Sequence, residues 1–249
     1  MGRPEKYKEE KEMIKLIFDA NRGRYGYRRI TLELRNKGYL LNHKTVQRLM
    51  KELHLKSMVR MKRYRSYRGE IGQIAPNVLD RNFTADKPNH KWVTDVTEFS
   101  LFGEKLYLSP ILDLFNGEII AYQIDKKPVF KMIIDMLGKA FERLKNGDAP
   151  ILHSDQGWQY QMKQYQSLLD QHSITQSMSR KGNCLDNSVM ENFFGQLKSE
   201  LLYLQEFNSI EHFIEELDEY IYYYNNKRIK VKLKGLSPVQ YRIQSSLVA

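Results

Sequence analysis

The sequence has too few cysteines for either a disulfide framework or a thiolate metal site. Cys184 is the single cysteine in 249 residues. One thiol cannot form an internal disulfide, and the zinc sites common in small DNA-binding domains take two cysteines beside two histidines. We therefore expect neither a structural disulfide nor structural zinc, and we treat Cys184 as inert.

Long apolar runs are also missing. No stretch approaches the roughly 18 apolar residues expected of a membrane-spanning helix, and residues 1–10 lack the apolar core of a signal peptide. The hydrophobic fraction of 41% is enough for a substantial core in one large domain or two smaller ones. We expect a cytoplasmic protein with no membrane partner.

Acidic residues are scarce in the N-terminal third. Residues 1–80 contain 20 Lys and Arg against 9 Asp and Glu, whereas residues 81–249 contain 20 against 21. An excess of positive charge suits a polyanion, because each phosphate neutralised by Lys or Arg releases condensed counterions. No strongly amphipathic basic helix indicates a membrane surface instead. The charge pattern therefore favours nucleic acid as the partner.

The basic third begins with helical patterns. Apolar residues recur at helical spacing in residues 5–19, a break follows at 21–26, and two further helices are separated by the turn Asn36-Lys37-Gly38, with Asn42 predicted to cap the last. This arrangement predicts a helix-turn-helix unit. The residues expected to contact DNA are Arg28, Arg29, His43, Lys44, Gln47, Arg48 and Lys51, whereas Val46, Leu49 and Met50 should face the core. A small helical hairpin with a solvated basic face is the open alternative.

Residues 54–90 change in character. They contain Pro76, Pro88 and a run of basic residues with interleaved tyrosines, which is typical of a linker that follows DNA. A merely solvated connector is equally compatible with this composition. The basic residues proposed to contact DNA here are Arg60, Lys62, Arg63 and Arg65.

The rest of the chain alternates between strand and helix signals. Strands are predicted at 92–99, 105–115, 118–124, 151–154 and 173–178, with helices at 130–145 and 159–171 and a further helix after residue 187. Asn116-Gly117 between two apolar runs is a strong hairpin signal. This order predicts an α/β domain with a mixed sheet covered by helices. A last helix at 209–226 carries tyrosines that we expect to pack, and a second basic patch follows at 227–234.

Three carboxylates stand out against this background. Asp95 and Asp155 lie in strand-like surroundings, and thirty-five residues separate Asp155 from Glu191 on the following helix. Lys198, seven residues after Glu191, shares its polar face, while Val189, Phe193, Leu197 and Leu201 form a separate apolar stripe. Converging carboxylates suit hard cations such as Mg²⁺, which prefer oxygen ligands.

These motifs resemble those of the DDE transposases and retroviral-type integrases, and more closely the long-frame (orfB) product of the IS-three family of bacterial insertion sequences. The matching segments are Trp-Val-Thr-Asp-Val-Thr at 92–97, His-Ser-Asp-Gln-Gly at 153–157, Ser-Arg-Lys-Gly-Asn-Cys-Leu-Asp-Asn at 179–187, Tyr-Asn-Asn-Lys-Arg at 224–228 and Leu-Ser-Pro at 236–238. The resemblance covers nearly the whole chain. It implies a ribonuclease H-like fold with a five-stranded mixed sheet in the order 3-2-1-4-5.

The resemblance also implies domains and roles. We expect a helix-turn-helix domain at 1–55, a basic linker at 56–90, a catalytic core at 91–205 and a C-terminal helical extension at 206–249. Asp95, Asp155 and Glu191 are expected to be catalytic and to bind two Mg²⁺ ions, for which Mn²⁺ could substitute. Lys181 and Lys198 are expected to contact DNA.

The implied reaction is Mg²⁺-dependent cleavage at the ends of an insertion sequence and transfer of the freed 3′-hydroxyl into DNA. The expected partners are double-stranded terminal repeats and target DNA, further copies of the chain on DNA, and an upstream-frame product fused by frameshifting; without that fusion, end recognition should be weak. DNA binding would associate the protein with the nucleoid. The alternatives are a metal-dependent nuclease without strand transfer and a non-catalytic DNA-binding regulator.

Several other residues could be mistaken for parts of a site. Glu98 has odd parity relative to Asp95 and should face away from it, and Asp113 should serve the hairpin. His153-Ser154-Asp155 lacks the geometry of a catalytic triad, because adjacent strand residues point to opposite faces. Trp158 is expected to pack. Glu200 lies outside the spacing match, so its neutralisation should matter little.

The charge distribution predicts how binding responds to salt. Removing residues 1–80 should flatten the plot of log affinity for non-specific DNA against log salt concentration, by about 0.9 for each phosphate that the shortened chain no longer neutralises. Titrations of full-length and shortened chains at several salt concentrations measure this slope. An unchanged slope would show that the excess charge of the N-terminal third does not contact phosphates.

Overall fold

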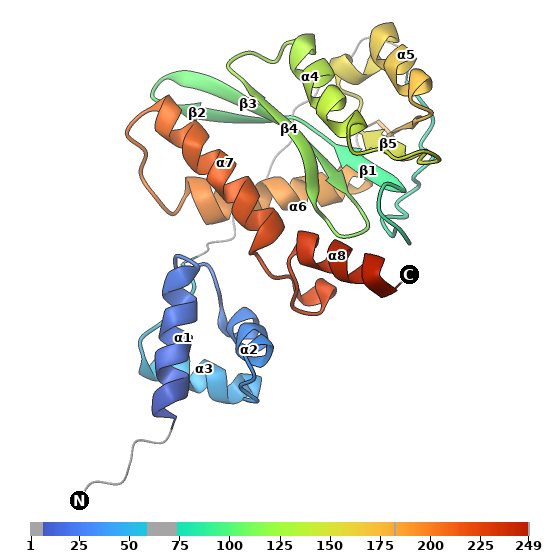
Figure 1. Ribbon diagram of the computed structural model, residues 1–249. Coiled ribbons are helices and arrows are strands. Elements are labelled where there is room, and N and C mark those ends of the chain that lie inside the picture. Colours follow the sequence, from blue (N-terminus) through green and yellow to red (C-terminus); the bar gives the residue numbers. More distant parts are fainter. Residues whose placement is uncertain (1–6, 59–73, 182, 249) are drawn as a thin grey trace, which may run out of the picture.

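The computed structural model describes residues 7–58, 74–181 and 183–248. A three-helix N-terminal unit lies beside a larger α/β core (Figure 1). The helices of the N-terminal unit are α1 (Lys8–Ala20), α2 (Tyr27–Asn36) and α3 (His43–Glu52). The strands of the core are β1 (Lys91–Thr94), β2 (Thr97–Leu101), β3 (Glu104–Asp113), β4 (Ile119–Asp125), β5 (Ile151–Ser154) and β6 (Thr175–Met178). Its helices are α4 (Phe130–Phe141), α5 (Lys163–Gln171), α6 (Ser188–Leu197), α7 (Ile210–Asn226) and α8 (Pro238–Val248), with short turns η1 (Trp158–Gln161), η2 (Cys184–Asn187), η3 (Lys198–Leu202) and η4 (Val231–Leu233).

The N-terminal unit forms as its amphipathic patterns predict. The side chain of Asn42 caps α3 by accepting a hydrogen bond from the backbone N–H of Lys44 at 2.9 Å. Val46, Leu49 and Met50 are buried against α1 and α2, as predicted. The opposite face of α3 is therefore free to carry polar residues without loss of core packing.

The sheet has the predicted order, with one interruption. β4 pairs with β3, β3 with β1, β1 with β5, and β5 with β6. The predicted strand 92–99 is divided into β1 and β2, which continue one antiparallel register against β3: Thr94 lies opposite Ile111, and Thr97 opposite Leu108. The six strands thus follow the five-stranded order 3-2-1-4-5, with the first strand broken at Asp95 and Val96. The break lies at the position of a predicted site residue.

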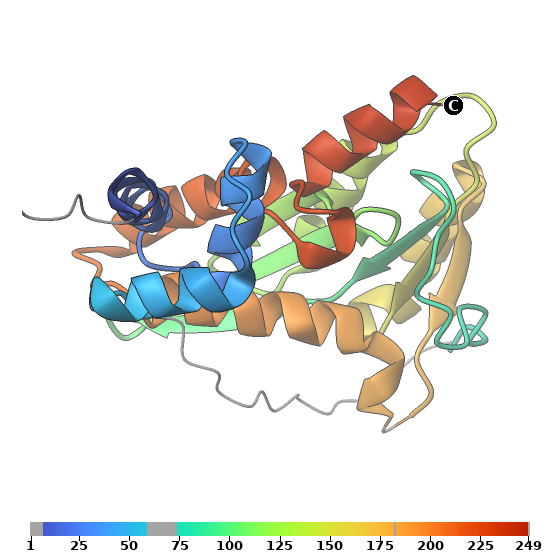
Figure 2. The same ribbon diagram turned by 90° about the horizontal axis from the view of Figure 1, so that it is seen from below.

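Helices cover both faces of the sheet. On one face α4 and α5 bury an apolar cluster that includes Trp92, Ile111 and Leu152. On the other face α6 and α7 pack on Val93, and this cluster continues into the core of the N-terminal unit. In the view from below, α6 runs along the strands of the sheet (Figure 2). The central strands β1 and β5 are accordingly almost fully buried, although each has two polar residues among its four.

The hairpin between β3 and β4 forms at Asn116-Gly117, as predicted. Gly117 has φ of 70°, a left-handed conformation that favours glycine, and a Cβ there would lie 2.6 Å from Nζ of Lys230. Asp113 accepts backbone N–H bonds from Asn89 and Phe115 at 2.8 and 2.9 Å. Asp113 therefore stabilises the turn, as expected.

Part of the predicted linker belongs to the core. Residues 75–84, called the strap below, lie along β6 and the loop that follows it: the backbone N–H groups of Val78 and Leu79 donate to Oγ of Ser177 at 2.9 and 3.0 Å. Leu79 is buried. Lys91 Nζ donates to the carbonyls of Asn82 and Thr84. A truncation that tests the charge of the N-terminal third should accordingly end before residue 75.

A buried carboxylate joins the N-terminal unit to the core. Glu200, in η3, is 2% exposed and accepts bonds from both Arg228 nitrogens Nε and Nη2, at 2.7 and 2.6 Å. Tyr220 and Arg29 donate to the same carboxylate at 3.1 and 3.3 Å. The expectation that neutralising Glu200 should matter little is therefore wrong, because its charge is desolvated and balanced by arginines.

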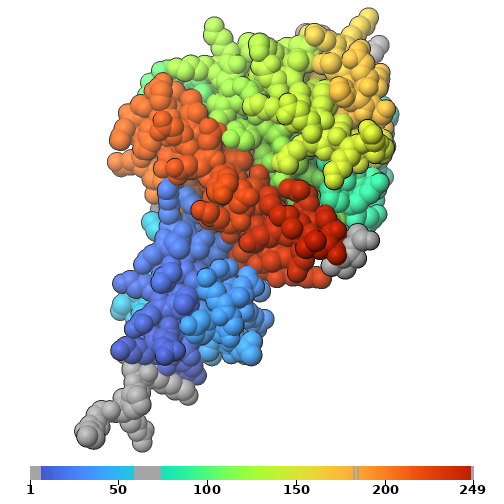
Figure 3. Space-filling view, viewed as in Figure 1, coloured from blue at the N-terminus to red at the C-terminus, as the bar shows by residue number. Residues whose placement is uncertain are grey.

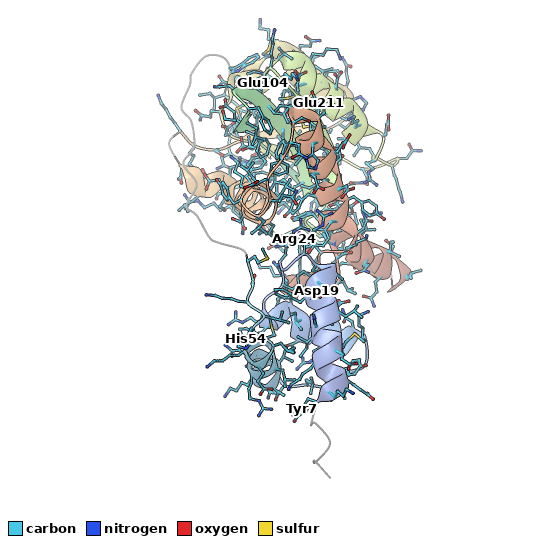
Figure 4. All side chains as sticks on the ribbon, turned by 90° about the vertical axis from the view of Figure 1, so that its left-hand side faces the viewer. Tyr7, Asp19, Arg24, His54, Glu104 and Glu211 are labelled. Atoms are coloured by element: carbon cyan, nitrogen blue, oxygen red, sulfur yellow. The ribbon has the colours of Figure 1, made fainter. Side chains whose placement is uncertain are left out.

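The junction is visible from outside as a continuous contact between α7 and the N-terminal unit (Figure 3). Arg24 lies at this junction (Figure 4) and donates from Nε to the backbone carbonyl of Glu200 at 2.9 Å. Arg22 pairs with Glu216 at 2.8 Å. The second basic patch predicted at 227–234 is smaller than expected, since Arg228 and Lys230 point inward, and Nζ of Lys230 donates to Gly117 O and Tyr224 OH. The tyrosines of α7 mostly pack, as expected: Tyr220, Tyr223 and Tyr224 are buried.

Across the described ranges, none of the helices combines the length and apolar character needed to cross a bilayer.

The Glu200 contacts predict a large stability effect. Glu200→Gln leaves the buried Arg228 guanidinium without its counter-charge, which should lower the free energy of unfolding by about 3 kcal/mol. Urea unfolding followed by fluorescence measures this change. Glu215→Gln, at an exposed position of α7, is the matched control and should alter stability by less than about 0.5 kcal/mol. Equal values for the two variants would show that the Glu200 charge does not stabilise the junction.

Candidate catalytic carboxylate site

Asp95 and Asp155 follow neighbouring parallel strands at the same level. β1 pairs with β5 so that Val93 lies opposite His153, and each aspartate is two residues beyond its member of that pair. Because side chains alternate along a strand, this register directs both carboxylates to one face at the carboxyl edge of the sheet. The pairing of β1 with β5 therefore brings the two aspartates together, although they lie sixty residues apart in the chain.

Each aspartate is fixed by the backbone beside it. Asp95 lies in the break between β1 and β2, where its Oδ1 accepts the Val96 N–H at 2.7 Å. Asp155 Oδ1 accepts the Gly157 N–H at 2.8 Å. A Cβ at residue 157 would lie 2.9 Å from that same oxygen, so glycine permits the close approach. Both carboxylates are thus oriented by backbone N–H groups.

Glu191 approaches from the helix that covers this edge. It lies in the first turn of α6 and is half-buried. The predicted apolar stripe packs as expected: Phe193, Leu197 and Leu201 are buried and Val189 is half-buried. Packing of that stripe against the sheet leaves the polar face of the helix turned toward the aspartates.

The three carboxylates act on one another electrostatically. Burial, followed by the negative charges of Asp155 and Glu191, holds the pKa of Asp95 well above its usual range. Burial also raises the pKa of Asp155 and of Glu191. Since like charges so arranged favour protonation, the site has a higher affinity for positive charge than separate surface carboxylates would have.

Most other buried carboxylates of the chain are paired with arginine, whereas these three are not. Asp186 pairs with Arg81, Glu118 with Arg242 and Glu200 with Arg228, at 2.7, 2.7 and 2.6 Å. Within the described part of the chain, Asp95, Asp155 and Glu191 form no ion pair with lysine or arginine. The same residues contain no group of three or more His, Cys, Asp or Glu side chains drawn together closely enough to hold a metal ion. The three carboxylates are therefore near but not in contact.

Lys198 lies two turns beyond Glu191, at the start of η3, where the helix widens to π geometry. Its Nζ is 5.5 Å from the centre of the Phe99 ring. Burial lowers the pKa of Lys198, and the charges of Glu98 and Asp95 oppose that change. Lys198 is thus a cation within electrostatic range of Asp95, at a π-helical widening of the kind frequent at functional sites.

The other predicted DNA contacts fall into four groups. Those on α3 and at the start of α2 are exposed, namely His43, Lys44, Gln47, Arg48, Lys51 and Arg28. Lys181 is exposed in the loop before α6. Arg29, by contrast, is turned into the junction and paired with Glu200, so it is not available to DNA in this arrangement. Arg60, Lys62, Arg63 and Arg65 lie outside the described residues.

The residues set aside from sequence behave mostly as expected. Glu98 is exposed and accepts a bond from Tyr107 at 2.9 Å. His153 contacts the hydroxyls of Ser177 and Ser179 at 2.8 and 3.2 Å, and Ser154 donates to a backbone carbonyl, so no triad forms. Trp158 differs from expectation: it is 46% exposed and does not pack fully into the core.

Sequence reasoning assigned no role to Asp186, which is fully buried among polar partners in the loop before α6. Asp186 lies within the motif at 179–187, and this position was the one feature of the sequence that could have indicated a role for it. Asn187, the next residue, is also buried. Both side chains make contacts with segments about a hundred residues earlier in the chain, which no local pattern indicates.

Comparisons with known proteins agree with this architecture. The family described as "Integrase core domain" matches residues 85–184 and, in a second profile of the same description, residues 191–246; an "HTH-like domain" matches residues 5–63. The chain is 58% identical over 245 residues to "Putative transposase InsK for insertion sequence element IS150" of Escherichia coli K12, covering 98% of this chain and 87% of that protein. It is 34% identical to "Transposase for insertion sequence element IS904" of Lactococcus lactis, covering 98% and 99% of the two chains.

Among solved structures, the core resembles the catalytic core domain of HTLV-2 integrase, determined in complex with magnesium in a trimeric form. The TM-score is 0.52 at 21% sequence identity, and the match covers 63% of this chain and 98% of that one. At this identity the similarity establishes the fold, which is the predicted ribonuclease H-like sheet flanked by helices.

The environment of His153 predicts a pH dependence of stability. Burial lowers the pKa of His153 from 6.5 to about 4 in the folded protein. Between pH 4 and 6.5, His153 is therefore protonated in the unfolded chain and neutral in the folded protein. The free energy of unfolding should fall as the pH decreases from about 6.5 to about 4, by up to about 3 kcal/mol.

Urea unfolding of the wild type and of His153→Gln across pH 4 to 8 isolates this effect, because the other titrating groups are common to both chains. The wild type should lose stability relative to the variant as the pH falls through this window. Parallel curves for the two proteins would show that His153 is not buried in its neutral form.

Proposed function

This chain belongs to the insertion-sequence transposases that carry an integrase core domain, and we propose that Asp95, Asp155 and Glu191 are its catalytic carboxylates. The protein is a DNA transposase of the DDE class, with a helix-turn-helix-like N-terminal unit that binds DNA. The assignment of individual residues rests on the site and not on the family alone. The observation that supports it is that these three carboxylates have no arginine counter-ion within the described ranges.

Three structural buried carboxylates have an arginine counter-ion: Asp186 has Arg81, Glu200 has Arg228 and Glu118 has Arg242. The fourth, Asp113, accepts two backbone N–H bonds. No arginine among the described residues pairs with Asp95, Asp155 or Glu191. Burial raises the pKa of all three carboxyl groups, and the charges of Asp155 and Glu191 raise the pKa of Asp95 further. Such an arrangement is costly unless a cation binds, since like charges at a half-buried site favour protonation. It supports a site that receives further positive charge, beyond that of Lys198, from outside the chain.

An all-oxygen donor set fits a hard divalent cation, so these three residues would hold Mg²⁺, with Mn²⁺ as a substitute. We propose two ions, as in other phosphodiester-cleaving sites where bound metal activates the attacking oxygen and stabilises the leaving oxygen. No protein nucleophile is then needed, consistent with His153 and Ser154 being engaged elsewhere. The reaction we propose is cleavage at element ends followed by transfer of the 3′-hydroxyl into target DNA.

The remaining residues orient the DNA. Lys198 presents an ammonium group beside the carboxylates, where it suits a phosphate of the element end. The exposed face of α3, with Lys44, Gln47 and Arg48, suits the major groove or the phosphates beside it. We propose Lys181 and Lys51 as phosphate contacts on the same grounds. Assembly of several copies on DNA and fusion to an upstream-frame product remain part of the proposal.

The role of Glu191 predicts a selective loss of activity. Glu191→Gln keeps the shape and helix propensity of the side chain, so the Phe193 and Leu197 stripe should pack unchanged. It removes the charge, and a neutral amide oxygen is a poor ligand for a hard cation. Cleavage and joining of labelled element ends in Mg²⁺ should fall below detection, with DNA affinity and unfolding midpoint preserved.

The control is Glu215→Gln, an exposed carboxylate on α7. Glu200 cannot serve, because it is part of the buried junction. Near-normal joining by the Glu191 variant would overturn the assignment. Cut but unjoined ends from the wild type, with target DNA present, would instead identify a nuclease that lacks strand transfer.

A further inference from the structure

Asp186 is a buried charge immediately before the catalytic helix. Its side chain is 0% exposed, and its carboxylate accepts from Arg81 Nε at 2.7 Å, Asn77 Nδ2 at 3.1 Å and the Arg180 backbone N–H at 3.0 Å. A further ion pair with Arg180 Nε measures 3.5 Å. These contacts hold the pKa of Asp186 below its usual range. Asp186 therefore binds the strap and its own loop together while remaining ionised.

The strap is a rigid partner for this contact. Two of its backbone N–H groups are held by Ser177 on β6, and two of its carbonyls accept from Lys91 at the start of β1. Asp80 and Arg81 have φ of 41° and 61°, a left-handed bend at the point where Arg81 turns to Asp186. Arg180 also pairs with Asp80, so two ion pairs connect the strap to the loop. Because the strap is bonded to the sheet on one side and to the loop before α6 on the other, it fixes that loop relative to the sheet.

Asn187, the next residue, connects the start of α6 to the end of β1. Asn187 is 5% exposed, and its Nδ2 donates to the carbonyl of Thr94 at 3.5 Å. Thr94 precedes Asp95 directly, and α6 begins at Ser188 and carries Glu191 in its first turn. Asp186 and Asn187 therefore hold the start of α6 from two sides: from the strap, and from the end of β1 where Asp95 emerges.

We propose that Asp186, clamped by Arg81 of the strap, is a positioning residue that sets the first turn of α6 so that Glu191 meets Asp95 and Asp155. The three carboxylates come from two strands and one helix and are not in contact, so the direction of α6 decides whether they can act on one phosphate. The strap is then a part of the active site and not of a linker. The inference rests on the proposed function for its catalytic consequence alone.

The chain supplies a matched control for the test. Arg81 is 42% exposed and pairs with a buried Asp186 that keeps a second arginine, Arg180. Arg242 is 33% exposed and pairs at the same 2.7 Å with a buried Glu118 that keeps Arg143. Arg81→Gln and Arg242→Gln therefore each remove one of two arginines from a buried carboxylate, one beside α6 and one at α8. Arg242 makes two hydrogen bonds to its carboxylate and Arg81 makes one, so the control removes at least as much interaction.

Two measurements are made on the full chain. Hydrogen exchange of the backbone amides in the first turn of α6 should accelerate in Arg81→Gln and not in Arg242→Gln, at similar unfolding midpoints. The single-turnover rate of end joining at saturating DNA should fall roughly 10- to 100-fold in Arg81→Gln, because small displacements of a catalytic group cost that much, with DNA affinity within about twofold of wild type. The Mg²⁺ concentration for half-maximal rate should rise. Arg81→Lys, which keeps the charge, should recover part of the rate.

Unchanged exchange in α6, or equal loss of joining by the two variants in proportion to their stabilities, would overturn the proposal. Asp186→Asn should show the larger effect of the same kind; if it does not fold, the Arg81 and Arg242 pair still decides. A wild type without metal-dependent joining would refute the proposed function, whereas the exchange measurement would continue to test the positioning of α6 independently.

Discussion

The parallel pairing of β1 with β5 holds two negative charges together, and the rest of the site depends on it. Val93 lies opposite His153, which places Asp95 and Asp155 at the same distance beyond the paired residues. A shift of one residue would send one carboxylate to the other face of the sheet. The repulsion between them is therefore opposed by the strand hydrogen bonds and by burial of Trp92 and Leu152 on the same strands. The fold maintains a charge arrangement that the isolated groups would not adopt.

Most buried carboxylates with a structural role are paired with arginine, whereas the proposed catalytic carboxylates are not paired with any arginine that the structure describes. Glu118 fixes α8 to the hairpin, Glu200 fixes the N-terminal unit, and Asp186 fixes the loop before α6, and each has an arginine. A buried, paired charge that loses its partner is expensive, so such pairs specify where segments meet. In the described part of the chain Asp113 also lacks an arginine, but it accepts two backbone N–H bonds beside the hairpin. Asp95, Asp155 and Glu191 lack an arginine there too, and they lie together at the carboxyl edge of the central strands and on the helix facing it. The lack of an arginine, together with the mutual repulsion of the three charges, thus supports the site by a criterion independent of motif spacing.

Sequence alone was sufficient for the parts of the structure that have local or fixed-spacing signals. The alternation around Asp95, the Asn116-Gly117 turn, the cap at Asn42 and the interval to Glu191 all report on nearby residues. Glu200 was misjudged because its partners Arg29 and Arg228 come from other segments, 171 and 28 residues away.

The strap was assigned to a linker for the same reason. Its partners Ser177 and Asp186 are about a hundred residues distant, so no local pattern indicates them. Ion pairs between remote segments leave no periodicity in a sequence, whereas a helix face or a strand does. The break between β1 and β2 was also missed, because the residues on both sides keep one register against β3.

The π-helical segment after α6 connects the two functions of the chain. Successive residues of a helix point about 100° apart, so Lys198 and Glu200 face roughly opposite sides of one short element. Lys198 lies against Phe99 beside Asp95, whereas Glu200 receives Arg29 through its carboxylate and Arg24 through its backbone carbonyl. The N-terminal unit, whose α3 carries Lys44 and Arg48, is thus joined to the carboxylate site through η3. The Glu200 junction consequently fixes the exposed face of α3, for which we propose DNA binding, relative to Asp95.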